Sequence, residues 1–224
     1  MNELNFDGIG MTSRRTRDRL IQRLEGQGIK NKRVLEVMAN TPRHWFLDEA
    51  LSHCAYEEKS IPIGHGQTLS QPYIVAKMTE LMIGRGPAPK SILEVGTGSG
   101  YQTAVLAQLF EKVWTIERIQ PLQRLAKQRL QQLGLRNIQY RYGDGNEGWQ
   151  SGAPYDAIIA TAAPSQVPQA LLGQLAPEGV LVIPVGDERK QELLWVKHDS
   201  QSGKFLRRVI EPAFFVPLLS GVVS

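Results

Sequence analysis

The 224-residue chain contains only one cysteine, Cys54, which excludes an internal disulfide and a cysteine-rich zinc site. Its four histidines lack the spacing of metal ligands, so we expect no metal. They are His44, His53, His65 and His198. No apolar run approaches the roughly 18 residues of a membrane-spanning helix. Glu3 and Asp7 argue against a signal peptide at the N-terminus, so we expect a soluble, cytoplasmic protein with no membrane partner.

An excess of charge is also missing, because 26 basic and 22 acidic residues leave a net charge of only +4. This balance is too weak to indicate a nucleic-acid partner, although it suits a partner that carries carboxylates. The arginines between positions 14 and 19 are interpreted as a solvated helix face. The length and the 42% hydrophobic content fit one domain over residues 1–224. Nothing demands an oligomer, and we expect a monomer.

Residues 1–90 form a helical N-terminal part in this interpretation. Thr12 or Ser13 caps a first helix, which ends near residues 26–28. A second helix covers 32–39, and Pro72 starts a third. Between them, residues 60–72 contain two glycines and two prolines without strand or helix periodicity, which predicts a loop.

Residues 91–186 alternate short apolar strands with helices, which is typical of βαβ units. The expected strands cover 91–95, 113–116, 137–142, 155–160 and 180–185, and the expected helices cover 101–109, 121–133 and 167–175. This order predicts an α/β fold with a doubly wound, mostly parallel sheet and helices on both faces. Two further strands, at 192–197 and within 205–219, have no helix between them and predict an antiparallel edge in residues 187–224.

The strongest local signal is a glycine-rich turn between the first expected strand and its helix. Gly96, Gly98 and Gly100 allow a tight turn and a close approach of a ligand to the main chain. Glu94 precedes the first glycine by two positions, where a carboxylate suits an ammonium group better than a pyrophosphate. The turn therefore favours S-adenosyl-L-methionine as cofactor over a dinucleotide, with Thr97 in the same turn as a further contact.

Two further carboxylates follow the next two expected strands. Glu117 ends its strand 21 residues after Gly96, a distance at which an acidic side chain can accept both ribose hydroxyls. Asp144, beside Gly145, can accept a hydrogen bond from the adenine amine. Because the carboxyl ends of parallel strands meet at one edge, the acidic side chains are expected to converge on one crevice.

These motifs resemble those of the protein-L-isoaspartate O-methyltransferase family, over roughly residues 12–219. The glycine turn, extended to residue 104, is similar to that family's cofactor motif. The discriminating stretch is residues 63–72, Ile-Gly-His-Gly-Gln-Thr-Leu-Ser-Gln-Pro, which generic methyltransferases lack. Residues 183–186 and 215–218 resemble two later family segments. Phe215 departs from the family, whose members often have arginine there, and residues 1–11 have no clear counterpart.

The resemblance implies a Rossmann-like class I methyltransferase that methylates the free carboxyl of L-isoaspartyl residues in damaged proteins and peptides and so initiates their repair. It assigns the catalytic role to Ser70. The implied substrate-binding residues are Ile63, His65, Gln67, Thr68, Ser70, Val185 and Gly186. A carboxylate acceptor is already ionised at neutral pH, so no general base is expected.

Three other interpretations remain open at this point. The chain could be a methyltransferase for a small molecule or a nucleic acid. That interpretation retains the cofactor site but does not use residues 63–72 as evidence for the acceptor. Against nucleic acid, the sequence lacks the Asn/Asp-Pro-Pro-Tyr/Trp motif of amino-methylating nucleic-acid enzymes. An NAD-dependent oxidoreductase conflicts with Glu94 and the glycine spacing. A binding module without catalysis conflicts with the intact set of cofactor residues.

Overall fold

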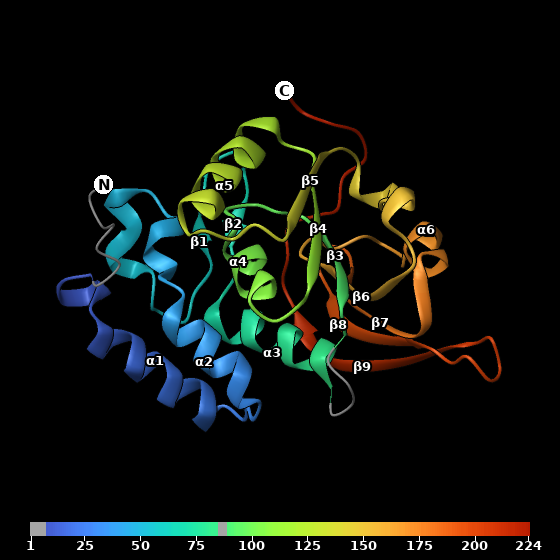
Figure 1. Cartoon of the computed structure of the whole chain (residues 1–224), viewed down its shortest axis with the longest axis horizontal. Coiled ribbons are helices and arrows are strands. Elements are labelled where there is room, and N and C mark those ends of the chain that lie inside the picture. The colour runs from blue at the N-terminus through green and yellow to red at the C-terminus, as the bar shows by residue number, and fades with distance from the viewer. Residues whose placement is uncertain (1–7, 85–88) are drawn as a thin grey trace.

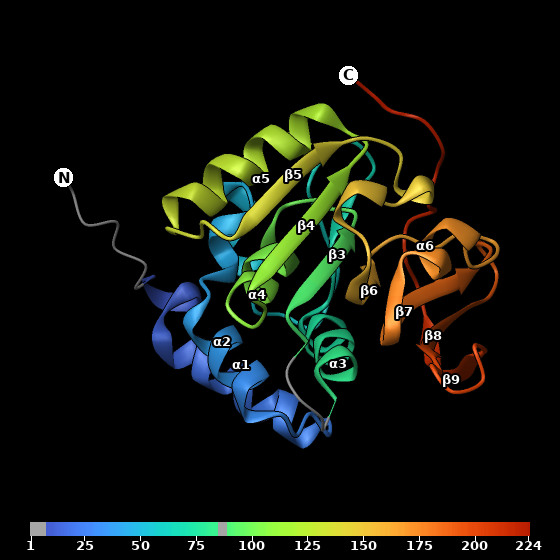
Figure 2. The same cartoon turned by 45° about the vertical axis from the view of Figure 1, so that its right-hand side comes forward.

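A computed structural model describes residues 8–84 and 89–224 of the chain. Its centre is a seven-stranded sheet with the order β5-β4-β3-β6-β7-β8-β9 (Figures 1 and 2). The strands are β3 (Ser91–Val95), β4 (Lys112–Glu117), β5 (Ile138–Tyr142), β6 (Tyr155–Ala160), β7 (Leu175–Gly186), β8 (Gln191–His198) and β9 (Phe205–Ala213). The first five are parallel, whereas β8 and β9 pair in antiparallel fashion. The predicted doubly wound sheet with an antiparallel edge is confirmed.

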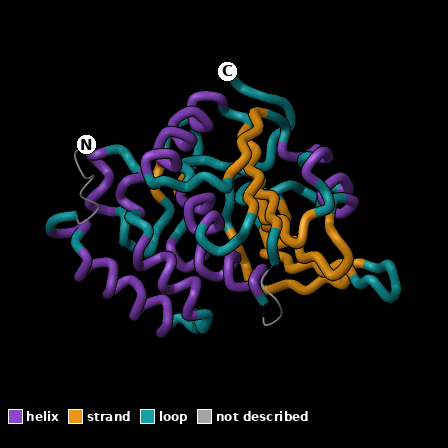
Figure 3. The backbone as a smooth tube through the Cα atoms, viewed as in Figure 1, coloured by secondary structure: helices purple, strands orange, loops and turns teal. Residues whose placement is uncertain are grey.

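In the described part of the chain, six α-helices cover this sheet unevenly. They are α1 (Arg14–Gly26), α2 (Lys32–Asn40), α3 (Pro72–Ile83), α4 (Tyr101–Ala107), α5 (Gln120–Gln132) and α6 (Gln169–Gly173). One hydrophobic core joins residues of α1 to α5 to one face of the sheet, and a second core joins α6 to the other face. Figure 3 shows the N-terminal helices on the side of the molecule opposite the antiparallel strands. Among the described residues, no helix is long and apolar enough to cross a membrane.

Local sequence signals account for the starts of several helices. The Asn31 side chain accepts hydrogen bonds from the backbone N–H groups of Arg33 and Val34, which caps α2. Pro72 occupies the first turn of α3, where a backbone N–H would have no acceptor within the helix, so proline costs no hydrogen bond there. Ser13 stands at the cap position of α1, as expected, although its side chain makes no capping bond.

The structure corrects three details of the sequence interpretation. The predicted loop at 60–72 contains an antiparallel hairpin of β1 (Ile61–Pro62) and β2 (Thr68–Leu69), whose strands are too short to show periodicity. Between β5 and β6, where the sequence interpretation placed no helix, lie two 3-10 turns, η4 (Gly145–Glu147) and η5 (Gln150–Gly152). The helix expected at 167–175 is only the five-residue α6. The last strand ends at Ala213, so residues 214–219 leave the sheet.

Candidate active site

The main pocket opens at the carboxyl ends of β3, β4 and β6, where the chain order reverses direction across the sheet. Crevices of this kind are the usual ligand sites of doubly wound sheets. Its empty volume is about 810 Å³, open to solvent. Five segments supply most of the lining: 95–99, 116–118, 67–70, 161–162 and 216–219. The pocket therefore brings the predicted glycine turn, the end of β4 and the 63–72 stretch together.

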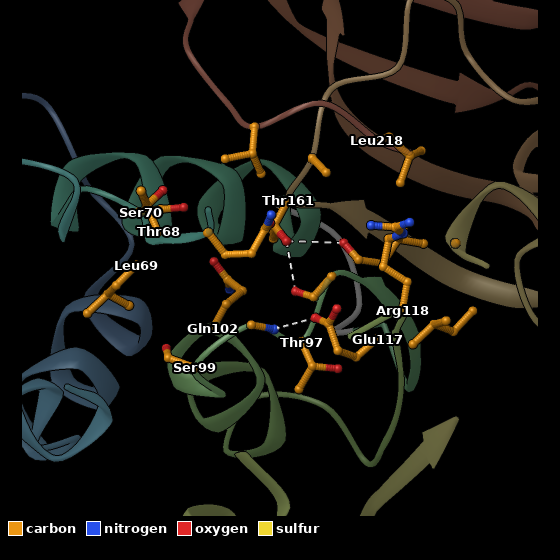
Figure 4. A pocket seen from close by; sticks show the side chains of 18 of the residues that line it. Thr68, Leu69, Ser70, Thr97, Ser99, Gln102, Glu117, Arg118, Thr161 and Leu218 are labelled. Atoms are coloured by element: carbon orange, nitrogen blue, oxygen red, sulfur yellow. Dashed lines mark hydrogen bonds between the residues drawn. The ribbon is translucent and has the colours of Figure 1, made fainter. Parts of the chain in front are cut away.

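The glycine turn has the backbone that the sequence predicted. Gly96 has φ +96° and Gly98 φ +53°, in the left-handed region that favours glycine. A Cβ at Gly96 would overlap the Thr161 hydroxyl. That hydroxyl donates hydrogen bonds to the carbonyls of Val95 (3.1 Å) and Gly96 (2.8 Å), drawn in Figure 4. Thr161 thus fixes the turn from the end of β6.

Glu117 lies in the pocket lining, as predicted. Its Oε2 accepts from the Gly98 N–H at 2.8 Å (Figure 4), and its Oε1 accepts from the Ile119 N–H at 2.9 Å. Burial raises the pKa of Glu117, while these two N–H donors oppose the rise. A carboxylate has about four lone-pair positions, so two remain available to hydroxyl donors in the pocket.

Glu94 is placed differently from the sequence interpretation, which put it beside the cofactor. Side chains alternate along β3, and Val95 lines the pocket while Glu94 is fully buried behind the turn. Its Oε2 accepts from the hydroxyls of Thr103 (2.5 Å) and Thr115 (2.6 Å), and no donor within residues 8–84 and 89–224 bonds to its Oε1. Burial raises the pKa of Glu94 to about 8. A hydroxyl contact of 2.6 Å links Thr115 to Thr97, which does line the pocket.

Asp144 and Gly100 also lie outside the lining. The Asp144 Oδ1 accepts from the Asn146 N–H (2.8 Å), and its Oδ2 accepts from the Gly221 N–H (2.7 Å). Asp144 thus holds the C-terminal tail, while its neighbour Gly145 faces the pocket. Gly100 lets α5 pack closely, because a Cβ there would lie 3.1 Å from that of Ala126.

The predicted substrate residues divide into two groups. Gln67, Thr68 and Ser70 line the main pocket, but Ile63 and His65 do not. The Ile63 side chain packs behind Gly98, 3.5 Å from where a Cβ would be, and His65 is exposed in the hairpin turn with φ +53°.

Val185 and Gly186 are also outside the lining; the pairing of β7 with β6 ends at Val182, whereas its pairing with β8 continues to Gly186. Residues 214–216 instead line a second hollow, which shares Thr68, Ser70, Thr161 and Val216 with the main pocket. The Gln191 side chain holds this segment by hydrogen bonds with both backbone groups of Phe215.

Sequence reasoning missed Thr161, Gln102 and Arg118 as site residues. Thr161 directly follows β6, so the rule that ligands bind at strand ends could have found it. Arg118 lines the pocket and donates to the carbonyls of Gly221 (3.0 Å) and Ser220 (3.2 Å), contacts that span about a hundred residues and have no local signal.

Known proteins resemble this chain along nearly its whole length. Residues 15–223 match the family model described as Protein-L-isoaspartate(D-aspartate) O-methyltransferase (PCMT). The protein-L-isoaspartate O-methyltransferase of Saccharophagus degradans is 59% identical over 222 residues, and that of Cellvibrio japonicus is 60% identical over 221. Each alignment covers 99% of both chains.

Two solved structures share the fold. A protein-L-isoaspartate O-methyltransferase superposes with a TM-score of 0.81 and 25% identity, covering 92% of this chain and 67% of that one. A Plasmodium falciparum structure described as a beta-aspartate methyltransferase, in complex with S-adenosyl-L-homocysteine, gives 0.76 and 22%, covering 92% and 99%. On the family match and the full-length relatives, this chain belongs to the protein-L-isoaspartate(D-aspartate) O-methyltransferase family.

Proposed function

We propose that this chain transfers the methyl group of S-adenosyl-L-methionine to the free carboxyl of L-isoaspartyl residues in damaged proteins and peptides. The neighbouring backbone amide nitrogen can then attack the ester carbonyl and release methanol to form a succinimide, which water reopens partly as normal aspartate. The observation that carries the proposal for this site is the position of Ser70, which lines both the main pocket and the second hollow. An acceptor held by Ser70 would lie where the two spaces join.

The main pocket has the features that S-adenosyl-L-methionine requires. Gly96 and Gly145 both line the pocket and present backbone without a side chain to a ligand; a Cβ at either would clash with Thr161 or Val95 respectively. Glu117 offers lone pairs to ribose hydroxyls, and Thr97, Gly98 and Gly145 complete the proposed contacts. When bound, the cofactor supplies an electrophilic methyl group on a sulfonium. We propose that Glu94, Gly100 and Asp144 support the segments that line this site without lining it themselves.

Ser70 is free to orient the acceptor. The cap position of α3 is Gln71, and the Tyr73 N–H of the first turn donates to the Glu58 carboxylate at 3.0 Å rather than to the Ser70 hydroxyl. Since the acceptor carboxylate, with a reference pKa near 4, is already ionised, catalysis rests on alignment. Proximity and orientation can supply roughly 7 to 11 kcal/mol. We propose that the Ser70 hydroxyl donates to one carboxylate oxygen while the other oxygen faces the methyl group.

The second hollow is the proposed path of the peptide chain. Its lining is uncharged, and Phe214, 80% exposed, stands at its rim. Thr68 belongs to both spaces, so it can contact the peptide backbone next to the acceptor. We propose Gln67 as a further substrate contact, and Ile63, His65, Val185 and Gly186 as supports of the surrounding segments.

The remaining proposals concern organisation. We propose that residues 1–224 act as a single domain and as a monomer in the cytoplasm, on peptide rather than nucleic-acid substrates. The continuous seven-stranded sheet and the modest net charge of +4 support this view.

Replacing Ser70 by alanine tests the proposed role directly. A hydrogen bond to a charged group contributes about 1.5 to 3 kcal/mol, so we expect Ser70→Ala to lower kcat for an isoaspartyl peptide by roughly 10- to 150-fold. Cofactor affinity, measured by calorimetry, should stay near the wild-type value. Ser70→Thr keeps a hydroxyl and should retain more activity than the alanine variant. An equal loss of cofactor binding in Ser70→Ala would refute the role.

A further inference from the structure

A buried arginine lies directly behind the 63–72 stretch. Arg43, the first residue of the 3-10 helix η2 (Arg43–Phe46), is fully buried. Its Nε donates to the carbonyl of Ala55 at 2.7 Å, and its Nη2 donates to the carbonyl of Ser70 at 2.6 Å. Among the described residues, the remaining arm, Nη1, has no hydrogen-bond partner of the usual geometry, while Tyr101 and Glu58 interact electrostatically with the guanidinium and raise its pKa against the effect of burial. Arg43 does not itself line the pocket. It acts on the site through its hydrogen bond to the Ser70 carbonyl.

The same guanidinium also contacts the element that follows the glycine turn. Its central carbon lies 4.9 Å from the centroid of the Tyr101 ring, a cation–π arrangement. Tyr101 is fully buried and is the first residue of α4, directly after Gly100. Arg43 therefore bridges the two segments that the reaction must align, the one carrying the acceptor contact and the one carrying the cofactor turn.

The energetic cost of this arrangement argues against simple space filling. Within residues 8–84 and 89–224, no carboxylate pairs with Arg43 at salt-bridge distance. Burial lowers the pKa of Arg43 to about 10, so the side chain is still charged at neutral pH. Apolar side chains of similar volume often fill such positions with equal or greater stability. The guanidinium must therefore contribute geometry, which its rigid fork of donors is suited to impose.

We propose that Arg43 is a positioning residue for methyl transfer, holding the Ser70 backbone at a fixed place relative to the start of α4. This inference rests on the proposed role of Ser70. A displacement of about 1 Å at a reacting centre can cost on the order of a hundredfold in rate. Loss of the Arg43 contacts would allow the Ser70 backbone to shift while the glycine turn, fixed separately by Thr161, keeps its shape.

The test compares Arg43→Met and Arg43→Lys with a matched control. Arg129 is half-buried on α5 and donates to the Phe46 carbonyl at 3.1 Å, so Arg129→Met also removes a guanidinium bond to η2 without touching Ser70. We expect Arg43→Met to lower kcat by about 10- to 100-fold, with cofactor affinity within about threefold of wild type. Arg43→Lys, which keeps the charge but not the fork, should lie between, and serves alone if the methionine variant does not fold. Arg129→Met should keep the wild-type kcat.

In the single variants, two results would overturn the proposal: a kcat loss no larger than that of the control, or a loss of cofactor affinity as large as the loss of kcat. A double-mutant cycle with Ser70→Ala adds a readout that general destabilisation would not change. We expect the Arg43→Met effect on kcat to shrink when Ser70 is already alanine. The experiment distinguishes a failure of the proposed Ser70 role from a failure of the proposed Arg43 role. Wild-type kcat in Ser70→Ala refutes the role of Ser70, whereas two losses that add in full refute the coupling to Arg43.

Discussion

Substituting alanine for Gly96 is expected to raise the apparent dissociation constant for S-adenosyl-L-methionine by at least roughly 30-fold. The new methyl group would overlap the Thr161 hydroxyl, and φ at Gly96 is +96°, a conformation that alanine adopts only under strain. A strained backbone conformation costs about 1 to 3 kcal/mol, and overpacking costs about as much again. Relief of this strain requires the turn to move away from Thr161, which would withdraw the backbone from the cofactor. Calorimetric titration with the cofactor measures the effect.

The matched control for Gly96→Ala is Gly134→Ala. Gly134 follows α5 with φ +73°, and a Cβ there would meet no other atom within 4 Å. This variant should lose about 1 kcal/mol of unfolding free energy but keep the wild-type cofactor affinity. If Gly96→Ala binds cofactor as tightly as Gly134→Ala, the assignment of the turn to the cofactor is refuted.

The second large effect concerns the pH dependence of stability. Burial raises the pKa of Glu94 from 4.5 to about 8, so between these values the native state binds more protons than the unfolded state. Stability must then fall as pH rises through that window. The Glu94 contribution should lower the unfolding free energy by roughly 3 kcal/mol between pH 4.5 and pH 7. In Glu94→Gln, which is neutral at every pH, this decrease should disappear.

The measurement is the difference in unfolding free energy between wild type and Glu94→Gln, by denaturant titration without cofactor across pH 4.5 to 8. A difference is needed because His44 acts in the opposite direction. Burial lowers the pKa of His44 to about 4, so its contribution raises stability as pH increases toward the pKa of the unfolded histidine. A pH-independent difference between the two proteins would show that Glu94 is ionised in the folded chain.

The sequence predicted those parts of the site that depend on local backbone and strand order. Gly96 and Gly98 are identifiable because their spacing occurs between a strand and a helix. Glu117 is identifiable because it ends the next parallel strand. The hairpin that carries Ser70 could be placed beside the pocket only through the family resemblance, since its two-residue strands leave no periodicity.

The parts that were not predictable depend on contacts between distant segments. The position of Glu94 behind the turn depends on which face of β3 meets α4, where Thr103 lies. The Asp144 carboxylate accepts a hydrogen bond from the N–H of Gly221, which lies 77 residues further along the chain. The role of this carboxylate could therefore not be predicted from neighbouring residues. The bond from Arg43 to Ser70 likewise joins separate segments, and neither end carries a sequence motif that indicates the other.

The proposed function is tested most directly by two synthetic peptides that differ only in carrying L-isoaspartate or L-aspartate at one position. Each is incubated with the protein and methyl-labelled S-adenosyl-L-methionine, and base-labile label on the peptide is counted. We predict label on the isoaspartyl peptide alone, because the proposed Ser70 contact orients a free carboxyl that is attached directly to Cα, whereas the aspartyl carboxyl is displaced by a side-chain methylene. Equal label on both peptides, or none on either while the cofactor still binds, would contradict the proposed acceptor.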